Sequence, residues 1–250
     1  MKYNRIEFLG SYVDNLSMSE TISEIEKAIE NGNQIHHVVV NAGKIVSLQK
    51  DQALKESVNS ADIINADGQA IVWAAKLLGT PLRERVAGID LFTNLLKVAD
   101  QKKYKVYLLG AKQEVLEKVK TNISNTYHND IVAGSANGYF DEAQEKLIIE
   151  DIVSCEPQML FVAMTSPKKE LFLHRNKELL KNVNFIMGVG GSFDVLSGNI
   201  KRAPVWLQKI GMEWFFRLIQ DPRRMWKRYL YGNLNFILLV LNKTRSSKNK

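Results

Sequence analysis

The chain has 250 residues, 45% of them hydrophobic, which is enough for one large α/β domain or for one domain with a substantial appendage. A single cysteine, Cys155, excludes an internal disulfide framework and a zinc cluster built on cysteines, and it fits a reducing compartment. The net charge of +7 is unevenly placed, because residues 201–250 hold 12 of the 34 Lys and Arg but only Glu213 and Asp221 among the acids. The remainder is mildly acidic, so the basic tail predicts an anionic partner: nucleic acid, acidic lipid or phosphate.

Neither a signal peptide nor a membrane-spanning segment is expected. Residues 1–15 lack the apolar run of a signal peptide, and no stretch approaches the roughly 20 apolar residues that span a bilayer. We therefore expect a cytoplasmic protein that is neither secreted nor integral to a membrane.

Short apolar runs alternate with helical patterns along most of the chain, which is typical of βα units and a largely parallel sheet. The expected strands are 35–40, 61–65, 104–110, 130–138, 158–164 and 182–191. The expected helices are 42–58, 69–79, a segment ending near 103, 111–124, 145–155, 168–180 and 192–198. The sequence thus predicts an α/β, Rossmann-like, mostly parallel sheet flanked by helices.

The βα rhythm stops at Asn199, and we expect an α/β domain over 1–200 followed by a helical appendage over 201–250. A first helix is expected to begin at Pro204 and to end before Pro222. Its apolar stripe comprises Leu207, Ile210, Trp214 and Leu218. A second helix follows, and FILLVL (236–241) is the one later segment with a strand pattern.

The appendage is rich in tryptophan as well as in cations, since Trp206, Trp214 and Trp226 are three of the four tryptophans. Such a mixture suits a helix at a membrane interface. A helix packed on its own domain explains the stripe equally well, and single-stranded nucleic acid is bound by the same residue types. The residues alone leave all three interpretations open.

Ligands of open parallel sheets bind beyond the carboxyl ends of the strands, so the loops there are the places for a site. Gly188, Gly190 and Gly191 in GVGG follow a strand and open a helix, which allows backbone amides to approach a phosphate. A tight packing turn is the alternative, because the spacing is not GxGxxG.

Two charged loops follow the second strand. Asp67 lies directly after it, where a carboxylate is able to act as a base or simply to satisfy a turn before a helix. Arg83 and Arg85 in TPLRERVAG suit a pyrophosphate, or form a solvated charge cluster. The four histidines show no metal-binding spacing and there is no DxD triplet, so we expect no metal and no cofactor.

Two long stretches closely resemble the WecG/TagA/CpsF family of bacterial glycosyltransferases. They are NADGQAIVWAAKLLGTPLRERVAGIDLF (65–92) and GVGGSFDVLSGNIKRAPVWLQKIGMEWFFRLIQDPRRMWKRYL (188–230). The resemblance extends more weakly through VVVNAGKIVSL (38–48), VYLLGAK (106–112) and SPKKE (166–170), and so covers most of the chain in order.

The resemblance implies an inverting, metal-independent transferase with no cofactor. It implies transfer of a sugar, first of all N-acetylmannosamine, from a UDP-sugar donor to a polyprenyl-diphosphate-linked acceptor. It further implies a place at the inner face of the cytoplasmic membrane, in teichoic acid, common antigen, capsule or exopolysaccharide synthesis. Self-association is a further property of the family, and its C-terminal appendage docks on the membrane and completes the site.

Site residues carry over from the family position by position. Asp67 matches the general base, and Asn41 and Arg85 match pocket positions. Gly110, Gly188, Gly190 and Gly191 are expected beside the donor phosphates. Arg217, Arg224 and Arg228 are expected on the acceptor diphosphate.

Two departures from the family pattern bear on sugar specificity. Val39 stands where the family often has threonine, and Lys169 stands where it often has glutamine. A lost hydroxyl and an added cation make glucose, galactose or a uronic acid alternative donor sugars. A nucleic-acid-binding protein is the remote alternative. A nicotinamide oxidoreductase fits poorly, because no helix, strand and acidic residue follow GVGG in the required order.

Overall fold

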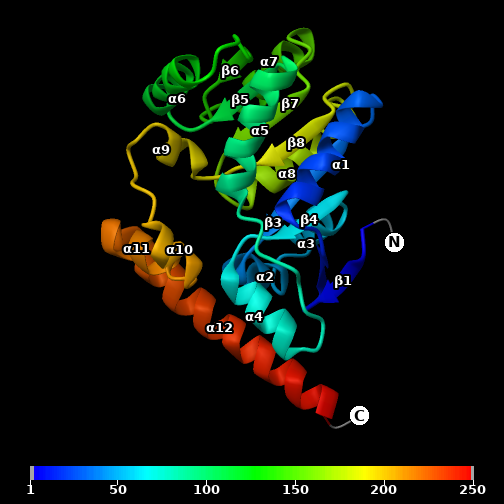
Figure 1. Cartoon of the computed structure of the whole chain (residues 1–250), viewed down its shortest axis with the longest axis vertical. Helices are drawn as coiled ribbons and strands as arrows, with labels where there is room; N and C mark the ends of the chain where they lie inside the picture. Colours follow the sequence, from blue (N-terminus) through cyan, green and yellow to red (C-terminus); the bar gives the residue numbers. More distant parts are fainter. Residues whose placement is uncertain (1–2, 249–250) are drawn as a thin grey trace.

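The computed structural model describes residues 3–248, except for the side chains at positions 224, 225, 227, 228 and 246–248. Its centre is a six-stranded sheet in the order β4-β3-β8-β7-β5-β6, and every neighbouring pair is parallel (Figure 1). The strands are β3 (Ile35–Val40), β4 (Ile63–Ala66), β5 (Val106–Gly110), β6 (Val132–Ala136), β7 (Met159–Ala163) and β8 (Phe185–Gly188). The predicted α/β, Rossmann-like architecture is confirmed.

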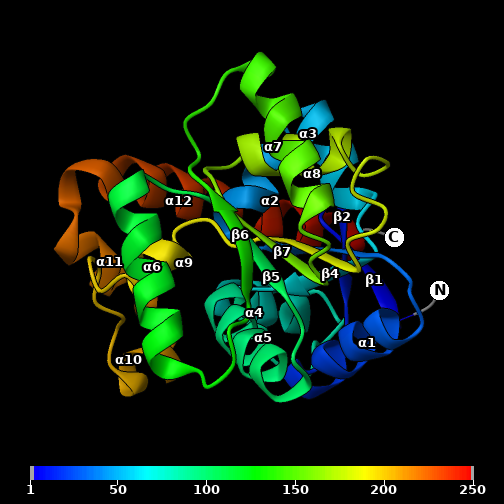
Figure 2. The ribbon, with the colours of Figure 1, turned by 90° about the horizontal axis from the view of Figure 1, so that it is seen from above.

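Helices cover both faces of this sheet, as Figure 2 shows in a view turned by 90° from that of Figure 1. Along β7 the side chains alternate, so that Met159 and Phe161 join the core cluster of α1, α5, α6 and α9, whereas Leu160 and Val162 join that of α7 and α8. The helices of these two layers are α1 (Met18–Glu30), α5 (Gly88–Lys102), α6 (Gln113–Thr126), α9 (Ser192–Leu196), α7 (Glu142–Ser154) and α8 (Lys168–Arg175).

The helix expected over 42–58 is in fact two helices, α2 (Ala42–Leu48) and α3 (Gln52–Asn59). Each has its own cap: Asn41 Oδ1 accepts from Lys44 N at 3.0 Å, and Asp51 Oδ1 accepts from Leu54 N at 3.0 Å. A second N-cap in mid-segment starts a new helix, which explains the break. The next helix is α4 (Gln69–Leu77).

The N-terminal region adds elements that the sequence patterns did not reveal. The strands β1 (Arg5–Phe8) and β2 (Ser11–Asp14) form an antiparallel hairpin, and α1 follows. Arg5 holds Asp14 through two hydrogen bonds of 2.8 and 2.9 Å, and Asp14 Oδ2 accepts from Ile64 N at 2.7 Å. A partly buried ion pair therefore ties the hairpin to β4.

The appendage consists of α10 (Val205–Lys209), α11 (Glu213–Gln220) and α12 (Pro222–Lys248). The single helix expected from Pro204 to Pro222 is wrong, because Gly211 interrupts it with a φ of +71°. A Cβ at this position would lie 2.9 Å from Gln69 Cβ. Glycine therefore allows the turn to pack closely against α4, where any larger residue would clash. Pro222 begins α12, as suits a proline at a first helical position.

The strand pattern of FILLVL was misleading, since the segment is part of α12. Phe236 and Val240, four residues apart, are buried in the core cluster that contains Phe8, with the rings of Phe8 and Phe236 6.5 Å apart. Ile237, Leu238 and Leu241 are exposed on the other side. A continuous apolar run cannot distinguish a strand from a helix by periodicity alone.

Helix α12 crosses α2 closely, and a Cβ at Gly232 would lie 3.6 Å from Gly43 Cα. The appendage therefore shares a core with the sheet domain, and its division from residues 1–200 stays a prediction. Within residues 3–248, no helix has the length and the apolar character required to cross a membrane.

Two adjacent histidines of β3, His36 and His37, predict how stability responds to acid. Burial lowers the pKa of His36 from 6.5 to about 3 and that of His37 to about 4. Below pH 6.5 both histidines become protonated in the unfolded chain but stay neutral in the folded protein. The free energy of unfolding therefore decreases as the pH falls. Between pH 6 and 5 both together contribute a slope of about 2 to 3 kcal/mol per pH unit in the free energy of unfolding.

Urea unfolding at pH 7, 6 and 5 measures this slope. His36→Leu is expected to halve the histidine contribution, whereas His128→Gln, at an exposed position, is expected to leave it unchanged. An unchanged slope in His36→Leu would contradict the assignment.

Candidate active site

Asp67 follows β4 directly and lies at the carboxyl edge of the sheet. Its backbone N–H donates to Val40 O at 2.9 Å, which continues the pairing of β4 with β3. Its Oδ1 accepts from Gly88 N, at the start of α5, at 2.9 Å. One oxygen of this half-buried carboxylate is thus anchored by a backbone amide, and the role of Asp67 as a general base stays a prediction.

Arg85 lies in the loop before α5, where the chain returns to the end of β4. Val86 N donates to Ala66 O at 2.9 Å, which ties the residue after Arg85 to the end of β4. The Arg85 guanidinium reaches Glu213 of α11 at 3.3 Å and Asp90 of α5 at 4.0 Å. Arg85 therefore joins the sheet domain to the appendage.

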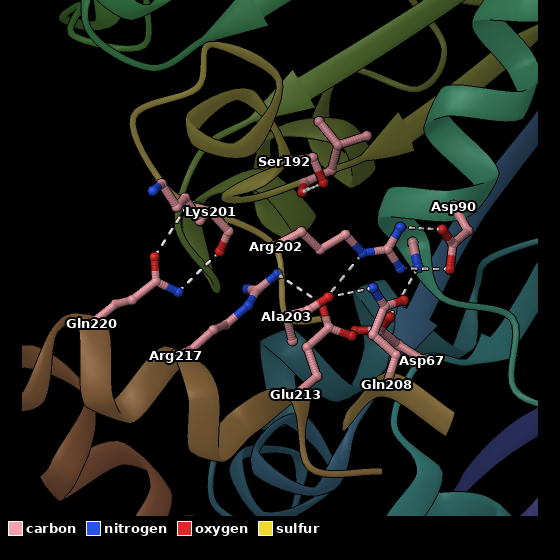
Figure 3. Close-up of polar contacts among 12 residues, drawn as sticks. Asp67, Asp90, Ser192, Lys201, Arg202, Ala203, Gln208, Glu213, Arg217 and Gln220 are labelled. Atoms are coloured by element: carbon pink, nitrogen blue, oxygen red, sulfur yellow. Dashed lines mark hydrogen bonds and ion pairs between the residues drawn. The ribbon is translucent and has the colours of Figure 1, made fainter. Parts of the chain in front are cut away.

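A second arginine, Arg202, joins the ionic cluster at this seam (Figure 3). It makes two hydrogen bonds to the Asp90 carboxylate, and its Nε lies 3.6 Å from Glu213 Oε1. The hydrogen bond and charge of Asp90 raise the pKa of Arg202 further, against the effect of burial, so the guanidinium stays charged. No motif or spacing in the sequence marks Arg202 or Asp90, and Glu213 stands out only as an acid in the basic tail.

Arg217 belongs to the same cluster, with its Nη2 3.7 Å from Glu213 Oε1. Arg217 and Arg85 thus meet at the same carboxylate, and the predicted contact of Arg217 with the acceptor diphosphate stays a prediction. Arg224 and Arg228 fall on α12, but their side chains lie outside the described residues.

Asn41 lies beside the Asp67 loop. A Cβ on Gly68 would be 3.6 Å from Asn41 Cβ, so the loops after β3 and β4 touch. The Asn41 side chain caps α2. That local role accounts for its position, and its predicted contact with the donor remains a prediction.

Val39 and Lys169, the two expected specificity positions, line one small cavity at this edge together with Gly188. The cavity has a volume of about 10 Å³, which is enough for about one water molecule. A Cβ at Gly188 would come within 2.8 Å of Lys169 Cδ, so glycine makes room for the lysine stem. The structure brings the two positions together, and their effect on the choice of sugar stays a prediction.

A buried ionic triad lies in the same cavity wall. Glu170 Oε1 is 2.7 Å from Lys44 Nζ and 2.8 Å from Lys169 Nζ, and its side chain is 2% exposed. Burial alone would raise the pKa of Glu170, but the charges and hydrogen bonds of both lysines outweigh it and lower the pKa to about 2. The triad holds Lys169 in place.

The glycines have local structural reasons. A Cβ at Gly110 would lie 2.5 Å from Ala163 O, so β5 ends in close contact with β7. In the GVGG turn, Gly190 has a φ of +55°, and the amides of Val189 and Gly190 donate to Val162 O at 2.9 and 3.4 Å. The packing alternative thus gains support, while phosphate binding at Gly110, Gly188, Gly190 and Gly191 remains a prediction.

No group of three or more His, Cys, Asp or Glu side chains with the spacing of a metal site occurs among the described residues. The positive charge at this edge comes from arginine and lysine.

Comparison with known proteins gives this site its context. Residues 6–250 match the Glycosyl transferase WecG/TagA/CpsF family. The chain belongs to this family. It is therefore a glycosyltransferase, as the two sequence stretches predicted.

Two relatives within the family carry the same name, N-acetylglucosaminyldiphosphoundecaprenol N-acetyl-beta-D-mannosaminyltransferase. The protein from Bacillus subtilis (strain 168) is 39% identical over 199 residues, covering 80% of this chain and 76% of its own. The protein from Bacillus spizizenii (strain ATCC 23059 / NRRL B-14472 / W23) is 33% identical over 245 residues, covering 98% and 91%.

The candidate site thus combines residues predicted from the sequence with others that no local pattern indicates. Glu170 and Lys44 are 126 positions apart, and Asp90 and Glu213 are separated by almost half the chain, so no local spacing connects them. A clue for Glu213 was its charge within an otherwise basic tail. Sequence alone does not indicate which cation such an isolated acid meets.

The triad predicts unequal effects of two neighbouring substitutions. Glu170→Gln leaves two buried lysines without their shared carboxylate, and we expect a loss of about 3 to 5 kcal/mol in the free energy of unfolding. Lys169→Gln keeps the pair of Lys44 with Glu170, so a loss of about 1 to 2 kcal/mol is expected. Urea denaturation at pH 7 compares the two, and equal losses would show that the triad is not the stabilising unit.

Proposed function

We propose that this glycosyltransferase moves N-acetylmannosamine from a UDP-sugar to an N-acetylglucosaminyl-diphosphate-polyprenol, with inversion at the anomeric carbon. The observation that carries the proposal is the shared name of the two relatives, which align with 80% and 98% of this chain. The position of Asp67 beside an arginine cluster supports the same chemistry.

Asp67 serves as the general base in this proposal. Gly88 N anchors its Oδ1, so Oδ2 takes the proton from the acceptor hydroxyl as that oxygen attacks the anomeric carbon. The bond to UDP breaks on the opposite face, and the configuration inverts. Direct displacement needs a single carboxylate, in keeping with one acid at the end of β4.

The leaving diphosphate is stabilised by fixed positive charge. Negative charge develops on UDP as it departs, and guanidinium groups held in place before the reaction lower the energy of that state. Arg85 of the sheet domain meets Arg202 and Arg217 of the appendage side around Glu213.

The side chains at positions 39 and 169 are the two departures from the family pattern that bear on the donor sugar. Valine offers no hydroxyl to a sugar amide, and Lys169 brings a cation held by Glu170. UDP-glucose, UDP-galactose and a UDP-uronic acid are therefore the donors to compare with UDP-N-acetylmannosamine.

Association with an anionic membrane surface is part of the proposal, since the acceptor is a lipid. Helix α12 carries apolar side chains on its outer side, all exposed: Leu230, Tyr231, Leu234, Ile237, Leu238 and Leu241. Their spacing of three and four residues forms one stripe, opposite the buried Phe236 and Val240. An exposed apolar stripe on a basic helix suits the membrane interface better than nucleic acid.

A direct test measures UDP release from a panel of UDP-sugars with a short-chain lipid-diphosphate N-acetylglucosamine acceptor. We expect UDP-N-acetylmannosamine to be preferred and Asp67→Asn to reduce turnover at least about hundredfold. Asparagine keeps an oxygen for Gly88 N, so the fold and UDP binding are expected to persist. Asp130→Asn, at an exposed position, controls for the change in charge.

Near-normal turnover of Asp67→Asn would remove Asp67 from the role of base. Preference for another UDP-sugar would retain the reaction class and correct the donor.

Membrane association is tested by sedimentation with vesicles of phosphatidylcholine and phosphatidylglycerol. Leu234→Ser with Leu238→Ser removes apolar area from the exposed stripe, and we expect vesicle binding at least about tenfold weaker. Leu147→Ser removes an equally exposed leucine from α7 and is expected to change nothing.

Salt-sensitive binding of oligonucleotides without vesicle binding would favour the nucleic-acid alternative.

A further inference from the structure

Glu213 lies at the centre of three guanidinium groups. Its carboxylate is 3.3 Å from Arg85, 3.6 Å from Arg202 and 3.7 Å from Arg217. These cations come from the loop before α5, from the segment before α10 and from α11 itself, so they converge from separate parts of the chain. Figure 3 shows Arg202 and Arg217 directed toward Glu213. At 14% exposure Glu213 is more enclosed than any of the three. A carboxylate in such a position occupies the place of an anionic ligand.

The charge balance of the cluster disfavours a second anion as long as the Glu213 carboxylate stays in place. Three arginines against Asp90 and Glu213 give one positive charge in excess. A diphosphate diester carries about one negative charge on each phosphate. With Glu213 in place the sum would turn negative and set phosphate against carboxylate, whereas its departure lets the charges of Arg85, Arg202, Arg217, Asp90 and the diphosphate cancel.

We infer that Glu213 is a positioning residue whose carboxylate holds Arg85, Arg202 and Arg217 together until a substrate diphosphate displaces it. The inference rests on the proposed function, which supplies a diphosphate on both substrates. It adds Arg202 to the anion-binding group and gives the acid of α11 a defined part in it.

Displacement requires only the Glu213 side chain to move. Arg202 keeps two hydrogen bonds to Asp90 after the carboxylate leaves. The far end of α11 is held independently, because the Gln220 amide group bonds to Lys201 N at 3.1 Å and to Lys201 O at 2.9 Å. Glu213 is the first residue of α11, so rotation of its side chain leaves the helix intact.

The test is calorimetric titration of the full-length protein with inorganic pyrophosphate. Glu213→Gln keeps the size of the side chain and removes the competing charge, so we expect pyrophosphate to bind about tenfold more tightly than to the wild type, about 1.4 kcal/mol. Glu213→Asp keeps the negative charge but moves it away from the arginines, because the side chain is one methylene shorter. We expect an affinity between those of the wild type and Glu213→Gln. If Glu213 only stabilised the fold, pyrophosphate would bind to Glu213→Gln as it does to the wild type, or more weakly.

Glu117→Gln is the matched control, since it removes one negative charge from an exposed pair with Lys120 on α6. It is expected to bind pyrophosphate as the wild type does. Equal affinities for Glu213→Gln and the wild type, or equal gains for Glu213→Gln and Glu117→Gln, would overturn the inference. Should Glu213→Gln fail to fold, the aspartate variant decides alone, and binding no tighter than in the wild type overturns the inference.

Two further ligands show which substrate displaces Glu213. Tighter binding of UDP to Glu213→Gln assigns the cluster to the donor, and tighter binding of geranyl diphosphate assigns it to the acceptor. Because these titrations need no turnover, they can succeed even when the sugar-transfer assay fails. A transferase that works as proposed, yet shows no gain of affinity in Glu213→Gln, would refute only the role of Glu213.

Discussion

The parallel pairing of β3, β4, β7 and β8 is the constraint on which the site depends. Parallel strands end at a common edge, so the residue after each strand comes close to the residues after its neighbours. Asn41 and Asp67 meet there, with their loops in contact at Gly68, and the chain returns to this edge at Arg85 through the bond from Val86 N to Ala66 O. A polar site at this edge costs little hydrophobic core, because the apolar contacts lie along the strands.

The second organising feature is the ionic seam between the sheet domain and the appendage. Glu213 of α11 meets Arg85 and Arg202, and Asp90 holds Arg202 from the other side. The charges are partly buried, so each depends on its partners to offset the loss of hydration. The same seam that places the appendage also gathers Arg85, Arg202 and Arg217, the cations that our proposal assigns to a diphosphate. A contact that serves both binding and architecture is well suited to respond to a ligand.

Helix α12 has two sides with different partners. Phe236 and Val240 anchor it in the core beside Phe8, while Leu234, Leu238 and their neighbours face outward. Burial on one side fixes the direction of the other, so the exposed stripe is presented at a defined angle to the site. The close approach of Gly232 to Gly43 connects this helix to α2, whose cap is Asn41.

Local patterns in the sequence were enough to predict the βα units, because a buried strand shows as an apolar run and a helix as a 3.6-residue period. It was also enough for the family, through residues 65–92 and 188–230, and for Asp67 at a strand end. It was not enough for the split of 42–58, the break at Gly211 or the helical state of FILLVL. In those places a cap, a positive φ and a shared core decided the outcome.

What only the tertiary structure decided is which charges meet. Asp90, Arg202 and Glu213 are ordinary helix and loop residues in the sequence, and Lys44 and Glu170 are 126 positions apart. Electrostatic pairing depends on distance in space and on burial, and neither is encoded in spacing along the chain. The sequence by itself determined the fold class, the family and the position of Asp67 after β4. The folded chain determined which acidic side chains pair with Arg85, Lys169 and Arg217.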